Sequence, residues 1–230
     1  GVSYTKAGLT VNKVIADGFP FSLTIGIYAS LVVVFAGILF GSVCALRQNK
    51  LIDRFFMVLS TLGSTIPSFV LATGFLFLFS KTLGLVPAFG VDEVAGYIGP
   101  VLVIGAFPLS FITRLTRTSL VEVQQQDYIR TARSKGISEF KVIYKHALRN
   151  ALLPVVTYIG PMVASIVTGS FVIETVFGIP GVGQLFTDSI VNRDYPLIMG
   201  ITVFFAVLLV LAVLIVDLVY VLIDPRIKLD

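Results

Sequence analysis

The sequence predicts an all-α, polytopic membrane protein with five transmembrane helices. Hydrophobic residues make up 56% of the 230 residues and charged residues only 13%, whereas soluble domains contain about 25% charged residues. Five apolar runs are each close to or beyond the roughly 20 residues that a helix needs to cross about 30 Å of hydrocarbon. The predicted spans are residues 21–45, 55–80, 96–113, 151–174 and 196–223.

The positive charges give these spans an orientation. Four of the 17 Lys and Arg residues lie in one set of alternating loops, and the others lie in residues 47–54, the loop 114–149 and the C-terminus. Because cations near span ends are retained on the cytoplasmic side, we expect the second set, including the C-terminus, to be cytoplasmic. The net charge of +4 follows from this bias, so we expect a lipid bilayer around the chain and no nucleic-acid partner.

Residues 1–17 would then be the end of an extracytoplasmic segment, and residues 18–230 the transmembrane domain. The sequence begins without the basic-then-apolar pattern of a signal segment. We therefore expect one more span upstream, which would give six in the complete protein.

Small and hydroxylated residues inside the spans indicate close packing or a pathway. Gly37 and Gly41 have the GxxxG spacing that permits close approach of a second helix. A polar patch around Pro67 in the second span and a face of small residues in the fourth are our candidates for lining a translocation pathway, and helix packing is the alternative. The candidate pathway residues are Thr61, Ser64, Thr65, Ser68, Ser165, Thr168 and Ser170.

The predicted extracytoplasmic loop, residues 176–195, contains the turn-rich string GIPGVG and is too apolar for an idle linker. Carboxylates at Glu174 and Asp217 stand at or inside span ends, where acids commonly mark functional sites, although pairing is the simpler interpretation for Asp217. We expect the loop to close the outer mouth of a pathway or to contact an external partner. The candidate residues are Glu174, Gly178, Pro180, Gly181 and Gly183.

The cytoplasmic loop 114–149 has a helix, turn, helix pattern. Asp127 is placed to cap a short helix through Lys135, and Gly136 suits the left-handed residue that ends it. Ser138 can begin a second helix with one apolar stripe. That stripe is Phe140, Ile143, Tyr144, Ala147 and Leu148, opposite Lys141, Lys145 and Arg149. Because loops longer than about 12 to 15 residues are usually functional, we interpret this loop as a rigid lever for a cytoplasmic motor.

The sequence contains no motif for chemistry of its own. It has no GxxxxGK[ST] phosphate loop and no His, Cys or acidic cluster at metal-ligand spacing. We expect no catalytic residue, no metal and no bound cofactor, so the chain is not expected to be an enzyme. A secondary transporter would need a coupling-ion site and broken-helix repeats, and a membrane enzyme would need reactive side chains within the spans. A structural scaffold would leave the lever unexplained.

Several strings resemble one family. RTARSKG at 130–136, followed by HALRNALLPV at 146–155, resembles the EAA loop of ABC importer permeases of the peptide and nickel subfamily. GSFVIETVFGIPGVGQLF at 169–186, NRDYP at 192–196 and DPRIKLD at 224–230 are similar to further signatures of that subfamily. Arg130 and Thr131 replace the Glu and Ala of the general EAA pattern, as is usual in the peptide branch, while Ala132 and Gly136 fit it.

The resemblance implies a type I ABC importer permease, of the first permease subunit type, in the bacterial cytoplasmic membrane. Its expected partners are a homologous second permease, two ATPase subunits that bind ATP and Mg²⁺, and an extracytoplasmic substrate-binding protein. Peptides are the expected cargo, with nickel, glutathione or another small solute as the alternative. The residues expected to dock on the ATPase are Arg130, Thr131, Ala132, Arg133, Ser134, Lys135, Gly136, Ile137, Ser138 and Phe140.

Overall fold

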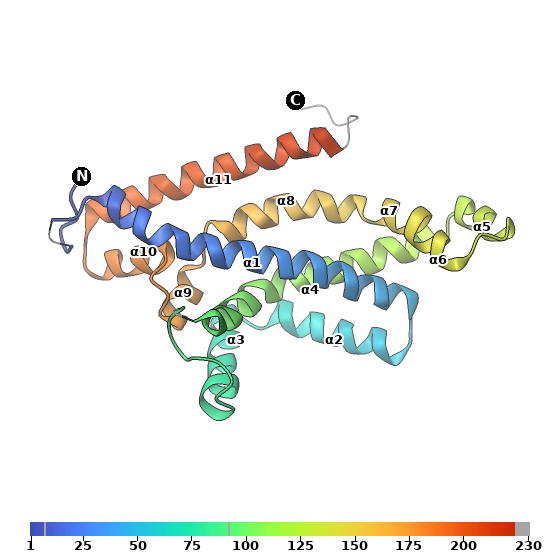
Figure 1. Cartoon of the computed structure of the whole chain (residues 1–230), viewed down its shortest axis with the longest axis horizontal. Coiled ribbons are helices and arrows are strands. Elements are labelled where there is room, and N and C mark those ends of the chain that lie inside the picture. The colour runs from blue at the N-terminus through green and yellow to red at the C-terminus, as the bar shows by residue number, and fades with distance from the viewer. Residues whose placement is uncertain (7, 92, 224–230) are drawn as a thin grey trace. The chain divides into compact units, whose positions relative to one another are not determined.

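Helices form nearly all of the regular structure in this computed structural model, which describes residues 1–6, 8–91 and 93–223 (Figure 1). Among these residues, the one strand-like feature is an isolated bridge between Val2 and Thr10. The all-α prediction is therefore confirmed. The C-terminal string at 224–230 and the side chain of Asp217 lie outside the described residues.

Three helices are long and apolar enough to cross a membrane, and two further pairs of helices qualify when each pair is taken together. The single helices are α1 (Val11–Leu46), α4 (Ile98–Gln124, preceded by a 3-10 turn at Val94–Tyr97) and α11 (Tyr195–Ile223). The pairs are Leu51–Thr65 with Ser68–Thr82, and Glu139–Ala151 with Leu153–Val167. Up to five spans in the described part agree with the predicted fold class.

The chain divides into two compact units. The first comprises Gly1–Leu31, Ile66–Gly105 and Gly160–Asp230, and the second comprises Val32–Thr65 and Ala106–Ile159. The second unit therefore holds the end of α1, α2 (Leu51–Thr65) and most of α4. It also holds the short helices from Asp127 to Ala151.

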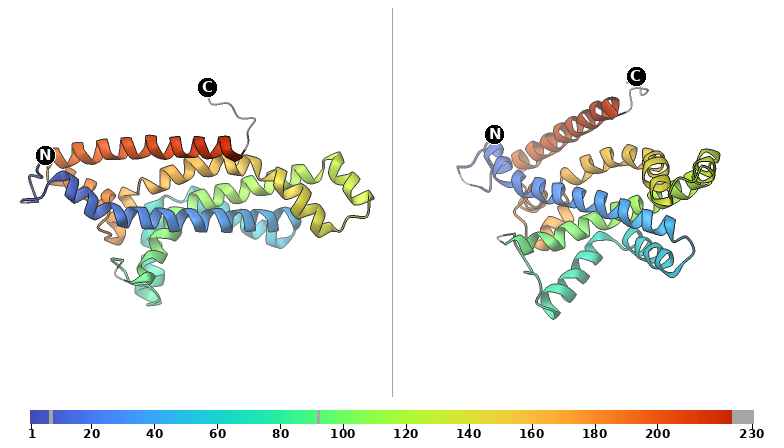
Figure 2. Two further views of the ribbon diagram at one scale, coloured as in Figure 1. Left: turned by 45° about the horizontal axis from the view of Figure 1, so that its top comes forward. Right: turned by 45° about the vertical axis from the view of Figure 1, so that its right-hand side comes forward.

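Glycines permit close helix packing in the second unit. A Cβ at Gly37 would lie 2.6 Å from Ile112, and one at Gly41 would lie 2.6 Å from the Thr113 carbonyl oxygen. The predicted close approach at the GxxxG pair is therefore confirmed, and the second helix is α4. A Cβ at Gly63 would lie 2.6 Å from Ser110 Oγ, so α2 also packs on α4 without a side chain between them. Figures 1 and 2 show α1, α2 and α4 side by side in this unit.

Two of the predicted spans contain a break. In the second span, α2 ends at Thr65 and α3 (Ser68–Phe75) begins after Pro67, whose ring removes a backbone donor and restricts the residue before it. A π-helix, Leu76–Thr82, continues α3. In the fourth, α8 (Leu153–Val167) is followed by Gly169 in the left-handed region (φ 91°). The next helix, α9 (Phe171–Phe177), starts at Ser170, whose hydroxyl accepts the Ile173 N–H.

The first unit is built around α1, α10 (Val182–Val191) and α11. Its apolar core contains Val11, Val14, Val182, Leu197 and Ile201, which are all buried. The ends of the three helices therefore meet in one core. This core also positions the turn that joins α10 to α11.

Candidate functional site

The predicted lever is present as two helical segments joined at Gly136, and we call residues 127–151 the elbow. Its first helix, α5 (Asp127–Ser134), has Gln126 at the N-cap position, so Asp127 lies in the first turn and the predicted cap is wrong by one residue. Gly136 has φ 76° and donates its N–H to the Arg133 carbonyl at 2.9 Å. The predicted left-handed glycine is therefore confirmed.

The second segment of the elbow differs from the prediction in its helical period. It consists of α6 (Glu139–Lys141), a π-helix (Val142–Ala147) and α7 (Leu148–Ala151). The wider π-turn buries Val142, Ala147 and Ala151, five and four residues apart. Phe140 and Tyr144 are 69% and 56% exposed. The predicted stripe assumed a 3.6-residue period, and the π-turn buries Ala147 but leaves these two aromatic residues exposed. That this face lies on the membrane surface or on a partner stays a prediction. Ser138 is at the N-cap position, but its side chain makes no capping hydrogen bond.

The elbow packs on the ends of two long helices. Ile129, Ala132, Val142 and Ala147 form one buried cluster with Ala45 of α1 and Leu120 of α4. Such a core fixes the elbow to the ends of α1 and α4, since buried apolar contacts resist local opening. Ala132 and the half-buried Ile137 therefore face the protein itself.

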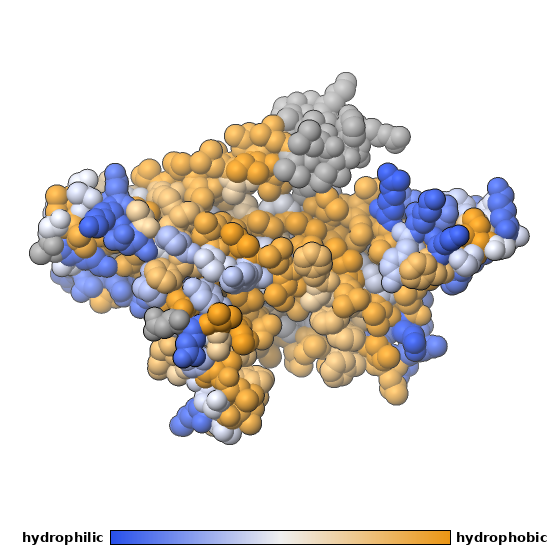
Figure 3. All heavy atoms as spheres, in the orientation of Figure 1, coloured by the Kyte–Doolittle hydropathy of each residue, from blue (hydrophilic) through white to orange (hydrophobic). Residues whose placement is uncertain are grey.

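The other eight predicted docking residues are exposed, and hydrophilic residues gather over α5 and α6 (Figure 3). Arg133 donates two hydrogen bonds to Glu139, at 2.7 and 3.2 Å, across the glycine turn. Phe140 and Tyr144 lie with their ring centroids 4.4 Å apart. The exposed face of the elbow thus combines cations, two of them paired with acids of the elbow, with an aromatic pair. The eight residues are Arg130, Thr131, Arg133, Ser134, Lys135, Gly136, Ser138 and Phe140.

A buried ion pair joins α2 to α4, and sequence reasoning missed it. Arg117 donates to both oxygens of Asp53, at 2.6 and 2.7 Å, and the Asn49 N–H donates to the same carboxylate at 2.8 Å. The Asp53 side chain is only 3% exposed. A bidentate, charge-assisted pair of this kind fixes both partners. The available signal was Asp53, a single acid among the cations of residues 47–54. Its partner was missed because Arg117 was predicted to lie in the loop 114–149, whereas α4 continues to Gln124.

The candidate pathway residues are divided between the two units. Thr61, Ser64 and Thr65 belong to α2 in the second unit, where the Ser64 hydroxyl accepts a hydrogen bond from Arg114 at 3.2 Å. Ser68, Ser165, Thr168 and Ser170 belong to the first unit, where Ser68 begins α3 and Ser165 is exposed. The Thr168 hydroxyl donates to the Ser165 carbonyl at 2.7 Å, and Ser170 caps α9. Local hydrogen bonding thus accounts for several of these hydroxyls, and their place on a pathway stays a prediction.

Glu174 organises the outer turn, which we define as residues 174–184. It is 1% exposed, and its carboxylate accepts the N–H groups of Gly183 at 2.8 Å and Gln184 at 3.2 Å. These donors lie in the first turn of α10, where orphan N–H groups and the helix dipole favour a negative charge. Ser22, from α1, completes the site because its hydroxyl accepts the Val182 N–H at 2.9 Å.

The glycines of the outer turn make room for this carboxylate. A Cβ at Gly183 would lie 2.9 Å from Glu174 Oε2, and one at Gly181 would lie closer still. Gly178 ends α9 in the left-handed conformation, with φ 62°, and Pro180 is exposed. The structure thus brings together the predicted residues Glu174, Gly181 and Gly183 and adds Ser22, which carried no signal in the sequence.

A second buried acid, Asp194, holds the N-terminal segment of the described chain. Its carboxylate accepts hydrogen bonds from the Ser3 hydroxyl, from the Thr5 N–H at 3.1 Å and from the Thr5 hydroxyl at 2.8 Å. It also accepts the Leu197 N–H at the start of α11, at 3.2 Å. Burial alone would raise the pKa of Asp194, but the hydrogen bonds from Ser3 and Thr5 outweigh it and hold that pKa well below its ordinary range.

The described residues, 1–6, 8–91 and 93–223, contain no group of three or more His, Cys, Asp or Glu side chains that could hold a metal ion. The acids instead serve as structural acceptors. Asp53 binds a guanidinium, while Glu174 and Asp194 accept backbone N–H groups near the starts of helices.

Comparison with known proteins places the chain in a family. The family described as binding-protein-dependent transport system inner membrane component matches residues 37–229. The dipeptide transport system permease protein DppB of Bacillus subtilis is 49% identical over 229 residues, covering 100% of this chain and 74% of that protein. The oligopeptide transport system permease protein OppB of Haemophilus influenzae is 43% identical, covering 99% and 75%.

A solved structure has the same fold. A chain of the inward-facing MetNI methionine ABC transporter superposes with a TM-score of 0.73 at 16% identity, covering 90% of this chain and 94% of that one. With the family match and the two relatives, this establishes the type I ABC importer permease fold. The chain belongs to the family of inner membrane components of binding-protein-dependent transport systems.

Proposed function

We propose that this chain is the permease subunit of an ATP-driven importer that carries peptides across the bacterial cytoplasmic membrane. The observation that carries the proposal is the 40–49% identity, over nearly the whole chain, to relatives named as dipeptide and oligopeptide transport permeases. Its cargo would come from an extracytoplasmic binding protein. Nickel, glutathione or another small solute is the alternative cargo for the same machinery.

In this proposal the elbow is the contact with a separate ATPase subunit. Its exposed face offers cations beside the Phe140–Tyr144 pair, and aromatic and Arg side chains dominate the binding energy of many protein interfaces. The chain has no phosphate-loop motif of its own, so ATP and Mg²⁺ would be held by two partner ATPases. A homologous second permease would complete the membrane part.

The buried contacts between the elbow and the long helices α1 and α4 would transmit its motion. A push on α5 reaches α1 and α4 through the cluster of Ile129, Ala132 and Val142. The Asp53–Arg117 pair then makes α2 follow α4, because breaking a buried, bidentate pair is costly. The nucleotide cycle of the ATPases would thereby turn several helices together and alternate the access of the cargo site.

Site-directed crosslinking tests the docking surface. A cysteine replacing the exposed Lys135 should form a crosslink with a cysteine on the ATPase in the assembled complex. A cysteine replacing Asp188, which is also exposed but lies on α10, is the control and should form none. Crosslinking at Asp188 but not at Lys135 would contradict the assignment of the elbow.

The cargo is tested separately, with the complex and its binding protein in proteoliposomes. Peptides should stimulate ATP hydrolysis above the basal rate, whereas nickel chelates and glutathione should not. Stimulation by one of these solutes and not by any peptide would overturn the peptide assignment and leave the docking surface standing.

A further inference from the structure

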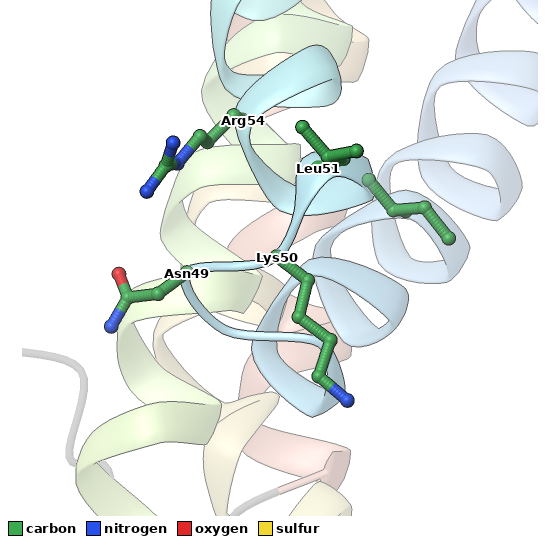
Figure 4. Close-up of a pocket in the computed structure, with 5 residues that line it drawn as sticks. Asn49, Lys50, Leu51 and Arg54 are labelled. Carbon is green, nitrogen blue, oxygen red and sulfur yellow. The ribbon is translucent and has the colours of Figure 1, made fainter.

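The turn between α1 and α2 carries an open pocket that the proposed transport mechanism does not use. It has a volume of about 550 Å³ and is lined by Asn49, Lys50, Leu51, Ile52 and Arg54. Figure 4 shows the side chains of Asn49 and Arg54 extending to the same side of the turn, while Lys50 extends from the other side. An amide and a guanidinium are thus presented together at one edge of the pocket.

The turn is held in this conformation by a buried carboxylate. Asn49 adopts the left-handed region with φ 63°, and its N–H donates to Asp53. Asp53 is also bound by Arg117, so its negative charge is compensated inside the protein.

Three cations remain on this turn, at Arg47, Lys50 and Arg54. None of them belongs to an ion pair within the residues that the structure describes. A pocket with this charge and with amide donors complements a phosphate group, since Arg forms paired hydrogen bonds with phosphate oxygens.

Apolar side chains surround the same turn. Leu51 is 81% exposed and Phe55 63% exposed, and the candidate span of α1 ends directly before the turn, at Leu46. Free cations beside exposed apolar side chains at the end of a span are typical of the membrane interface, where basic pockets bind anionic headgroups.

We infer that the α1–α2 turn binds an anionic phospholipid, with Arg54 and Asn49 on its phosphate, Lys50 adding positive charge, and Leu51 and Phe55 along its acyl chains. The site would hold one lipid against the α2–α4 pair that the elbow moves. The inference requires that the chain is in a membrane but does not depend on which cargo it carries.

Native mass spectrometry of the delipidated importer complex, titrated with phosphatidylglycerol or phosphatidylcholine, tests this site. The wild type should retain phosphatidylglycerol preferentially. Lys50→Gln/Arg54→Gln should weaken phosphatidylglycerol binding about 10- to 30-fold, since each cation near an anionic headgroup contributes on the order of 1 kcal/mol. Phosphatidylcholine, whose headgroup has no net charge, should lose less, so the preference for phosphatidylglycerol should disappear. Lys13→Gln/Lys81→Gln, which removes two exposed cations outside both the pocket and the elbow, is the control and should keep the preference.

Three results would overturn the inference. The first is an equal loss of phosphatidylglycerol in both double variants, which would indicate a general effect of charge. The second is binding of inorganic phosphate as tight as that of phosphatidylglycerol, which would indicate an anion site without a lipid. The third is an unchanged preference for phosphatidylglycerol in Lys50→Gln/Arg54→Gln, which would indicate that neither cation holds the headgroup.

Discussion

The elbow and the outer turn each depend on a glycine, but for different physical reasons. Gly136 in the elbow has φ 76° and open space around the position of a Cβ, so its backbone conformation requires glycine. Gly181 in the outer turn has an ordinary backbone, with φ −86°, but a Cβ there would collide with the Glu174 carboxylate and the Ser22 hydroxyl. One glycine is needed for conformation and the other for space.

This difference separates the proposed docking surface from a turn whose polar groups bind one another. The elbow exposes its polar residues and is supported from behind by an apolar cluster. The outer turn instead buries a carboxylate and surrounds it with backbone donors. Substitutions in the elbow should therefore affect coupling more than stability, and substitutions in the outer turn should do the reverse.

The largest effect is expected for Gly181→Ala. The added methyl group overlaps the Glu174 carboxylate and must displace it from the Gly183 and Gln184 N–H groups, at a cost of about 3 kcal/mol or more. We expect little intact complex, measured by size-exclusion chromatography and by Tm in detergent. Asp188→Ala, which removes an exposed acid from α10, should behave as the wild type. A stable Gly181→Ala complex would contradict the space argument.

A somewhat smaller loss is expected for Asp53→Asn, which tests the buried acid that joins α2 to α4. The substitution leaves Arg117 without its charged partner, and removing one member of such a pair costs on the order of 3 kcal/mol. We expect a lower Tm together with a lower ratio of cargo-stimulated to basal ATP hydrolysis. Glu122→Gln, at an exposed acid on α4, is the control. A lower Tm with unchanged coupling would show that the pair is structural only.

A pH-dependent effect is expected at Asp194, which belongs to the same compact unit as the outer turn. Because hydrogen bonds hold its folded-state pKa below the ordinary value of about 3.9, its stabilising contribution is fully present above that value and is lost as the pH falls toward the folded-state pKa. The difference in Tm between wild type and Asp194→Asn should be constant from about pH 8 to 5 and should narrow below about pH 4. A difference that widens on acidification would have the wrong sign.

The smallest effect on stability is expected for Gly136→Ala. Because a Cβ there meets no other atom, the cost is only that of a left-handed alanine, about 1 kcal/mol, and asparagine should cost less. A Tm decrease of roughly 2–4 °C for alanine would agree with this value. If alanine and asparagine lowered the Tm as much as Gly181→Ala does, the proposed distinction between the two turns would be lost.

The sequence predicted those features that have a periodic or local signal. Apolar run lengths predicted long apolar helices, the GxxxG spacing predicted the close approach of a second helix, and the glycine in the cytoplasmic loop predicted the turn at Gly136. These features depend on neighbouring residues in the chain. They can therefore be read without knowledge of the tertiary structure.

The features that sequence reasoning missed depend on residues far apart in the chain. Asp53 and Arg117 are 64 residues apart, and Ser22 and Val182 are 160 residues apart. The π-turn of the elbow was also missed, because its buried residues follow a spacing that the helical period does not contain. Only the packing of the helices reveals these partners.

The central claim is that the elbow faces the cell interior and is covered by a separate ATPase. It is tested most directly by labelling Lys135→Cys, in a Cys44→Ser background, with a membrane-impermeant maleimide. We expect labelling in inside-out vesicles but not in right-side-out vesicles, and protection when the ATPase subunits are assembled on the permease. Labelling from the outside, or equal labelling with and without the ATPase, would contradict it.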